Sequence, residues 1–257
     1  MKKYTELKQY LFVVRQLVAR EIKRKYSRSY LGILWSVLNP LLNMVVLSFI
    51  FTKMFSRSIE NYPLYLLTGQ TIWQLFTGAT NAAMTVMVDN RVMLTRVKFP
   101  MMIFPVARVY SALVNYLYTF VAYLLMLLVF RIRPGLTMLA APAVILCVTL
   151  FSMGIGCLLA VAYVFFADIK YLYTVLLSLW MYCSAIFYPV EQLPEMIGRV
   201  IEANPVYNYI ACMRSVMLYA SWPTASQWLR MLLWAAAMYL FGYLVFRKSQ
   251  NRIMQTV

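Results

Sequence analysis

The residues best suited to chemistry in this sequence are bases that gather near its N-terminal end. Four of them stand close together, immediately before the first long apolar stretch: Lys23, Arg24, Lys25 and Arg28. An arginine guanidinium presents a rigid fork of N–H donors that matches two oxygens of a phosphate group. The cluster therefore indicates a site for a phosphate-bearing ligand, although the same charges could bind anionic phospholipid headgroups and orient the chain in a membrane.

Acid–base and nucleophilic catalysis have little support in the sequence. The chain contains no histidine and only eight acidic residues, whereas histidine is the usual general base and the commonest metal ligand. The motifs G-x-S-x-G and H-E-x-x-H are missing, and Asp89 and Asp168 are far apart in the chain. We therefore expect no catalytic residue, no metal site and no cofactor in this chain.

The sequence also lacks the G-x-x-x-x-G-K-[ST] loop that binds nucleotide phosphates. If the protein moves a solute uphill, the energy must come from another chain or from an ion gradient. A gradient-driven carrier usually shows acids within its spans and inverted repeats, and neither is visible here. These observations favour a separate ATPase as a partner.

Composition indicates what kind of scaffold holds the bases. Of the 257 residues, 63% are hydrophobic and 12% are charged, against about 25% charged residues in an ordinary soluble domain. A soluble domain is therefore disfavoured, and disorder is excluded because it requires low hydrophobicity. The net charge of +16 would suggest nucleic acid for a soluble protein. In a membrane protein it indicates loops that face anionic lipid, so we expect no nucleic-acid partner.

The sequence predicts an all-α polytopic membrane protein with six transmembrane helices. A helix needs about 20 mostly apolar residues to cross a bilayer. The predicted spans are residues 31–52, 65–88, 108–130, 142–166, 172–189 and 227–246. Lysines and arginines number 17 on one side of this arrangement and seven on the other. Because cytoplasmic segments are enriched in these bases, we expect both termini in the cytoplasm and the chain in the cytoplasmic (inner) membrane.

Residues 6–26 are predicted to form an amphipathic helix in the cytoplasmic interface of the membrane. Its apolar residues recur at steps of three and four, which places them on one helical face, while most of its bases lie elsewhere. The residues of this face are Leu7, Leu11, Val14, Val18 and Ile22. The chain thus divides into a cytoplasmic segment, 1–30, and a transmembrane domain with a short tail, 31–257.

Residues 191–223, before the last span, contain short apolar clusters that are separated at Asn204-Pro205. Neither cluster is long enough to cross a bilayer, so we expect two short re-entrant helices. Ser152, Gly156 and Ala160 are spaced four apart in the fourth span, a pattern that favours close helix packing. Asn39, in the first span, could either join helices or face a channel.

Several stretches, in order along the chain, resemble the permease subunit of ABC-2 type polysaccharide exporters. This family exports O-antigen, capsular polysaccharide or teichoic acid. The stretches are 30–40 (YLGILWSVLNP), 62–69 (YPLYLLTG), 97–115 (VKFPMMIFPVARVYSALVN), 165–172 (FFADIKYL), 184–195 (SAIFYPVEQLPE) and the pair at 204–205. One departure is Ala167, where the family pattern has a basic residue before Asp168.

The resemblance implies six spans in a homodimer that works with two copies of a separate ABC ATPase, which would carry ATP and magnesium. It implies a coupling helix seated on that ATPase, in which Leu94 and Val97 would supply apolar docking contacts. A second contact would come from Asp168 and Lys170. The coupling helix would comprise Asn90, Arg91, Val92, Met93, Leu94, Thr95, Arg96, Val97 and Lys98.

The resemblance further implies a cargo of polysaccharide linked to polyprenyl pyrophosphate. Lys23, Arg24, Lys25 and Arg28 would receive the pyrophosphate. A path for the polymer should offer aromatic faces and scattered hydroxyls rather than fixed charge, and its candidate residues are Trp35, Asn39, Tyr116, Tyr163, Tyr182, Phe187 and Tyr188. Three alternatives stay open: an ABC-2 exporter of a small lipid or drug, a membrane-embedded transferase, and a scaffold that transports nothing.

Overall fold

The computed structural model describes residues 2–27, 29–55, 59, 61–96 and 100–256. Within this part of the chain the regular structure is entirely helical, which confirms the predicted fold class. The first half contains α1 (Lys2–Tyr26), α2 (Leu34–Phe55), α3 (Tyr62–Met84), α4 (Val86–Asp89), α5 (Arg91–Arg96) and α6 (Ile103–Val129). The second half contains the 3₁₀ helix η1 (Leu136–Ala140), α7 (Ala141–Phe165), α8 (Ile169–Tyr182), the 3₁₀ helix η2 (Val190–Gln192), α9 (Glu195–Ala203), α10 (Pro205–Met217) and α11 (Ala225–Thr256).

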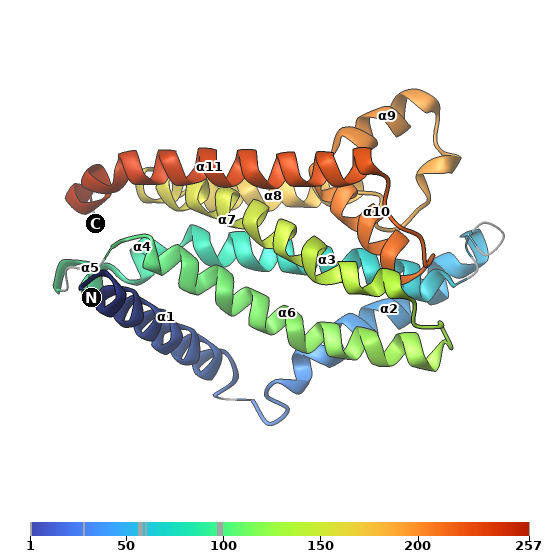
Figure 1. Ribbon diagram of the computed structural model, residues 1–257, viewed down its shortest axis with the longest axis horizontal. Helices are drawn as coiled ribbons and strands as arrows, with labels where there is room; N and C mark the ends of the chain where they lie inside the picture. The colour runs from blue at the N-terminus through green and yellow to red at the C-terminus, as the bar shows by residue number, and fades with distance from the viewer. Residues whose placement is uncertain (1, 28, 56–58, 60, 97–99, 257) are drawn as a thin grey trace.

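The long helices run side by side along the longest axis of the molecule (Figure 1). Helices α4 and α5 lie at one end of the bundle, together with both chain termini, and α9 and α10 lie at the other end (Figure 1). Helix α1 packs against α6. The fold therefore has one end that carries the termini and the short helices α4 and α5, and an opposite end built around the two short helices before α11.

Helix α3 is the central helix, since it packs against α2, α6, α7 and α10. Several of its polar side chains form hydrogen bonds inside the bundle. The hydroxyl of Thr68 lies 2.8 Å from that of Tyr123 and donates to the Leu64 carbonyl. The hydroxyl of Tyr173 donates to Thr80 Oγ1 over 2.7 Å. A polar helix is tolerated at this place because neighbouring helices separate it from lipid.

Three helical segments are long and apolar enough to cross a membrane: Ile103–Val129, Leu136–Phe165 and Ala225–Thr256. They make the chain a multi-pass membrane protein. Helix α2 contributes a shorter apolar stretch, Leu34–Ile50. Helix α8 has 14 residues, so it reaches only about 21 Å against a hydrocarbon core of about 30 Å. The predicted span 172–189 is therefore too long, and the six-span count stays a prediction.

Helix α8 is shorter than predicted because the chain leaves helical geometry after Cys183. Ala185 adopts a left-handed backbone conformation with φ of 46°. The carbonyls of Ala185 and Ile186 then accept hydrogen bonds from the Arg214 guanidinium on α10. The apolar sequence up to residue 189 had concealed this turn, because periodicity alone does not report a contact made by a distant side chain.

Two short helices precede α11, as the sequence predicted, and they meet at Asn204-Pro205. The Asn204 side chain caps α10 by accepting from the backbone N–H of Val206. It also accepts from Trp180 Nε1 and donates to the Cys183 carbonyl. Pro205 occupies the first position of α10, where a helix needs no N–H. Asn204 thus ends one helix, begins the next and ties both to α8.

The predicted apolar face of α1 is only partly correct. Val18 is buried, and Val14 and Ile22 pack against the same apolar cluster. Leu11 is 62% exposed, and Leu17 is buried in its place. The contact seam of α1 therefore runs through Leu17 and Val18 and does not continue to Leu11.

Small residues set two close helix crossings. A Cβ on Gly156 of α7 would lie 2.7 Å from Ala83 Cβ on α3, which confirms the packing role predicted for this stripe. The crossing of α7 and α11 is tighter and was not predicted. A Cβ on Gly154 would lie 2.1 Å from the Met238 carbonyl oxygen, and one on Gly242 would lie 2.1 Å from the Gly154 carbonyl oxygen.

The substitution Gly154→Ala is expected to destabilise the protein by about 3 kcal/mol, at the upper end of the cost of overpacking. The added methyl group would meet backbone atoms, which cannot rotate away as a side chain can. Thermal unfolding of the purified protein in detergent measures the effect. The matched control is Gly78→Ala on α3, where a Cβ meets nothing within 4 Å. Equal melting temperatures for the two variants would contradict the tight crossing.

Candidate functional site

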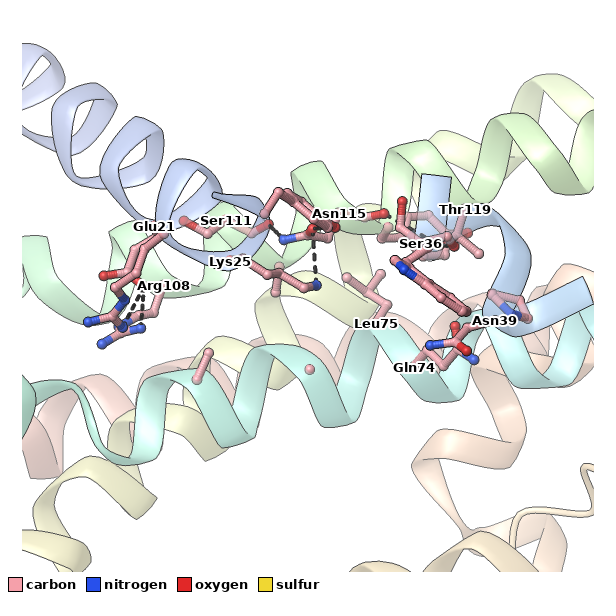
Figure 2. A pocket seen from close by; sticks show the side chains of 18 residues that line it. Glu21, Lys25, Ser36, Asn39, Gln74, Leu75, Arg108, Ser111, Asn115 and Thr119 are labelled. Atoms are coloured by element: carbon pink, nitrogen blue, oxygen red, sulfur yellow. Dashed lines mark hydrogen bonds and ion pairs between the residues drawn. The ribbon is translucent and has the colours of Figure 1, made fainter. Parts of the chain in front are cut away.

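A cavity of about 570 Å³ lies between α1, α2, α3 and α6 (Figure 2). Charged side chains gather at one end of it, around Glu21 and Arg108, and neutral amides at the other, around Asn39 and Gln74 (Figure 2). The cavity brings together segments that are distant in the sequence, because α1 packs against α6 and α2 packs against both α3 and α6. It is the place where the predicted phosphate site and the predicted polymer path meet.

Arg24 and Lys25 occupy the last turn of α1 and line the cavity. Lys25 Nζ donates to Asn115 Oδ1 over 3.2 Å, and the Tyr26 hydroxyl donates to the same oxygen over 2.6 Å. Asn115 is neutral, so it orients the ammonium group without cancelling its charge. In the described ranges, no carboxylate lies within ion-pair distance of Lys25. A compact cation that faces a cavity in this way is suited to bind an anion.

Arg108, on the second turn of α6, forms the centre of an ionic network at the charged end. Its Nη1 lies 2.6 Å from Glu21 Oε2 on α1, and its Nη2 lies 2.6 Å from Asp89 Oδ2 at the end of α4. Glu21 also pairs with Arg24 over 3.1 Å. Arg20 donates to Asn90 Oδ1 over 2.8 Å. The network therefore joins α1, the α4–α5 segment and α6 beside the cavity.

The other end of the cavity offers aromatic faces and uncharged hydrogen-bonding groups. Trp35 and Asn39 of α2 and Tyr116 of α6, three of the residues predicted for a polymer path, line the cavity. Gln74 of α3 adds a second amide. Thr119 Oγ1 donates to the Ser36 carbonyl and fixes α2 against α6. This arrangement can hold an anion at one end and a hydroxyl-rich group at the other.

Four predicted path residues do not line this cavity. Tyr163 is half-buried in α7 and packs on the core. The ring centres of Tyr182, the last residue of α8, and Phe187 lie 6.0 Å apart. The Tyr188 hydroxyl donates to the Tyr182 carbonyl. Tyr182, Phe187 and Tyr188 thus stabilise the turn between α8 and η2, close to the end of the bundle that carries α9.

Only part of the predicted basic cluster belongs to the described lining of the cavity. Lys23 is exposed and is not part of the lining. Arg28 lies outside the described residues. Of the predicted basic cluster, Arg24 and Lys25 therefore line the cavity, and their role in binding a phosphate stays a prediction.

The predicted coupling segment, residues 90–98, contains α5 and directly follows α4, at the end of the molecule that carries both termini (Figure 1). Arg91, Val92 and Thr95 are exposed there, and Met93 is half-buried. Asn90 and Leu94 are buried, so the expectation that Leu94 offers an apolar contact to a partner is wrong. Leu94 instead packs in the cluster that contains Phe104 of α6. Arg96 ends α5, and Val97 and Lys98 lie outside the described residues.

Asp168 and Lys170 are exposed at the start of α8. Because α7 and α8 are joined at the end of the bundle that carries α4 and α5 (Figure 1), both predicted contact regions share one end of the molecule. This shared position is compatible with a single partner, and the partner itself stays a prediction.

Sequence reasoning missed three residues with prominent roles in the structure. The sequence places Arg108 only at the first position of the predicted span 108–130, but it lies inside α6 and is 9% exposed. Glu21 had received no role. A signal was present, since Glu21 is one of two acids among the many bases of the first 30 residues. Arg214, within the segment 191–223 that is predicted to form short re-entrant helices, is 4% exposed in α10, and no pattern around it in the sequence indicates burial.

Comparison with known proteins identifies the family. The profile described as ABC-2 type transporter matches residues 13–218. An O-antigen export system permease protein RfbA from Myxococcus xanthus is 28% identical over 240 residues, 90% of this chain and 92% of the relative. One from Klebsiella pneumoniae is 28% identical over 211 residues, 81% and 82% of the two chains. The polysialic acid transport protein KpsM of Escherichia coli is 24% identical over 213 residues, which are 80% of this chain and 81% of the relative. Since the profile covers most of the chain, including α2, α3 and α6 in full, this protein belongs to the ABC-2 type transporter family.

Proposed function

We propose that this chain is the permease subunit of an ABC transporter that exports a polysaccharide linked to polyprenyl pyrophosphate. In this proposal the cavity between α1, α2, α3 and α6 receives the pyrophosphate and the first sugars. A separate ATPase subunit binds ATP and magnesium and drives export, and this chain contributes no ATPase site. The functional unit is a homodimer of this chain with two ATPase subunits.

The printed functions of the relatives support the cargo class. Two are O-antigen export permeases and one is a polysialic acid transport protein, and each aligns with four fifths or more of this chain. O-antigen, capsular polysaccharide and teichoic acid are all polymers of the kind proposed. The polymer itself is left open by these names.

The layout of the cavity is the observation that carries the proposal. Arg108 and Arg24, both paired with Glu21, supply positive charge at one end, and Lys25 lies beside Asn115 toward the middle (Figure 2). Trp35 and Asn39 supply an aromatic face and an amide at the other end. A lipid-linked glycan has the same polarity, with a dense negative charge followed by hydroxyl-rich rings. Guanidinium and ammonium groups bind phosphate oxygens through charge-assisted hydrogen bonds, while amides and aromatic faces bind sugars without fixed charge.

The proposed orientation places the end that carries α4, α5 and both termini in the cytoplasm, in a chain that crosses the cytoplasmic membrane six times. The excess of lysine and arginine in the segments at that end supports this orientation. Helix α1 then lies at the cytoplasmic interface, and its Arg24 and Lys25 stand where a lipid pyrophosphate arrives from the inner leaflet.

Depletion of the protein in its native cell tests the proposed cargo. Lipid-linked glycan should accumulate in the inner leaflet, and an assay of its sugars and phosphorus would separate a teichoic acid from a neutral polysaccharide. Unchanged surface polymers without accumulation would contradict the proposal and would favour an exporter of a small lipid or drug.

The double substitution Arg24→Gln and Lys25→Gln is expected to weaken binding of a fluorescent polyprenyl pyrophosphate by about 100-fold. Each substitution removes a charge-assisted hydrogen bond, worth about 1.5 kcal/mol or more, and 1.4 kcal/mol corresponds to about tenfold in affinity. Titration of the transporter in nanodiscs of neutral lipid provides the measurement. The control is Lys23→Gln, which removes a neighbouring charge outside the cavity. An equal loss in the control would show that general surface charge, and not the cavity, attracts the ligand.

A further inference from the structure

Glu21 occupies an unusual position for an acid in a site that we propose to bind an anion. Of the residues that line the cavity, it is the one with a carboxylate. Its side chain is 11% exposed. One oxygen, Oε2, accepts from Arg108 Nη1 over 2.6 Å and from Arg24 Nη2 over 3.1 Å. The other, Oε1, is buried without a hydrogen-bond partner among the described residues and lies 3.6 Å from Arg20 Nη2.

The Glu21 carboxylate therefore holds two of the three cations of the cavity. Lys25 is the third, and it rests on the neutral side chain of Asn115. A ligand that is to use all three cations must compete with Glu21 for Arg24 and Arg108. Before the ligand binds, Glu21 takes the place of the anion.

Arg108 has a second carboxylate partner that is independent of Glu21. Its Nη2 lies 2.6 Å from Asp89 Oδ2, and Asp89 Oδ2 also accepts from Thr85 Oγ1 over 2.8 Å. Loss of the Glu21 contact thus leaves Arg108 anchored to α4 and still directed at the cavity. The exchange of Glu21 for a ligand requires little rearrangement of α6.

The charge of the competing anion decides whether this exchange is favourable. A phosphodiester headgroup such as that of phosphatidylglycerol carries one negative charge, so it only replaces one carboxylate with another anion of the same charge. A pyrophosphate carries more charge and more acceptor oxygens, so it can form more charge-assisted hydrogen bonds with the cations of the cavity than a phosphodiester can. Without Glu21, Arg24 and Lys25 would have no carboxylate partner among the described residues, and the many anionic phospholipids of the inner leaflet would occupy the cavity.

We propose that Glu21 determines the specificity of this cavity. It excludes singly charged phosphodiester headgroups by pairing with Arg24 and Arg108, and it yields to pyrophosphate. This inference rests on the proposed function and adds to it the basis on which the cargo lipid is selected from the surrounding membrane.

The test compares the wild-type transporter complex with the Glu21→Gln variant in nanodiscs of phosphatidylcholine that contain increasing amounts of phosphatidylglycerol. The probe is a fluorescent polyprenyl pyrophosphate. Wild-type affinity should change little as phosphatidylglycerol rises. The affinity of Glu21→Gln should equal or exceed that of the wild type in neutral lipid and should fall by about tenfold as phosphatidylglycerol occupies the cavity, which corresponds to one freed charge-assisted contact.

The matched control is Glu195→Gln on α9, which removes a carboxylate paired with Arg199 at the opposite end of the bundle. This variant should behave as the wild type. If Glu21→Gln does not fold, Glu21→Asp provides the same test with the charge retained but the reach shortened. We then expect an intermediate sensitivity to phosphatidylglycerol.

Two failures are distinguishable in this design. If the wild type does not bind the probe in neutral lipid, the proposed function fails. If the wild type binds the probe but both Glu21 variants keep its response to phosphatidylglycerol, the proposed function stands and the specificity role of Glu21 is refuted.

Discussion

Replacement of Val92 by aspartate is expected to abolish ATP-driven export while the protein stays folded. Val92 lies on α5 and is 60% exposed at the end of the molecule that we place against the ATPase. A docked partner would cover this side chain, and a carboxylate buried there without a partner costs several kilocalories per mole. We expect the affinity for the ATPase to fall by about 100-fold or more. Export in cells and the ATP hydrolysis that depends on the permease should be lost as a result.

Two further variants make this prediction specific. Val200→Asp makes the same change at a similarly exposed valine on α9, at the opposite end, and should leave ATP hydrolysis unaltered. Leu94→Asp places a charge in the apolar cluster of this chain and should lower the melting temperature, which Val92→Asp should not do. Wild-type ATPase binding by Val92→Asp would refute the assignment of α5 as the docking helix.

The helices themselves were largely predictable from the sequence, because their signals are local. The apolar runs that became α6, α7 and α11 are long and nearly free of charge, and the break at Asn204-Pro205 marks two short helices by the ordinary chemistry of a helix start. Helix α1 was found from its periodicity. Helix α8 was overestimated, since its apolar run continues past the point at which Arg214 holds the chain in a turn.

The cavity was only partly predictable, because its charged end depends on contacts between distant segments. Glu21 and Arg108 are 87 positions apart in the chain, and nothing in the local sequence of either indicates that they meet. A buried arginine needs a partner, but the sequence does not say which acid provides it. Arg24, Trp35 and Tyr116 were selected by residue type and do line the cavity. The same criterion also selected Tyr163 and Tyr182, which lie elsewhere, so residue type alone does not identify the lining.

Arg214 is the second residue for which we expect a large effect. It is almost fully buried in α10 and has no carboxylate within ion-pair distance in the described part of the chain. Its guanidinium donates to the carbonyls of Tyr65, Ala185 and Ile186. Its Cζ lies 3.4 Å from the centre of the Tyr65 ring. One side chain thus joins α10, α3 and the turn after α8.

Gly69 shows how closely this arrangement is packed. A Cβ at Gly69 would lie 2.9 Å from Arg214 Nη2 and 3.3 Å from Ile186 Cγ2. The absence of a side chain on α3 therefore makes room for the guanidinium. The contact is also specific for arginine. The planar guanidinium directs N–H donors toward carbonyls on two sides, whereas the compact ammonium group of a lysine cannot reach both.

The substitution Arg214→Met is expected to destabilise the protein by on the order of 3–5 kcal/mol, because three carbonyls lose their donor inside the bundle. Export should be lost with it, since the turn that follows α8 is no longer held against α3. Arg214→Lys should retain neither the full stability nor the full export activity of the wild type. Arg199→Met on α9 is the control, because Arg199 is 77% exposed in a surface pair with Glu195 and such pairs contribute about 1 kcal/mol or less. Thermal unfolding measures the loss of stability, and the amount of polymer at the cell surface measures the loss of export. If Arg214→Met had the same melting temperature as Arg199→Met, the three carbonyls would have found other donors.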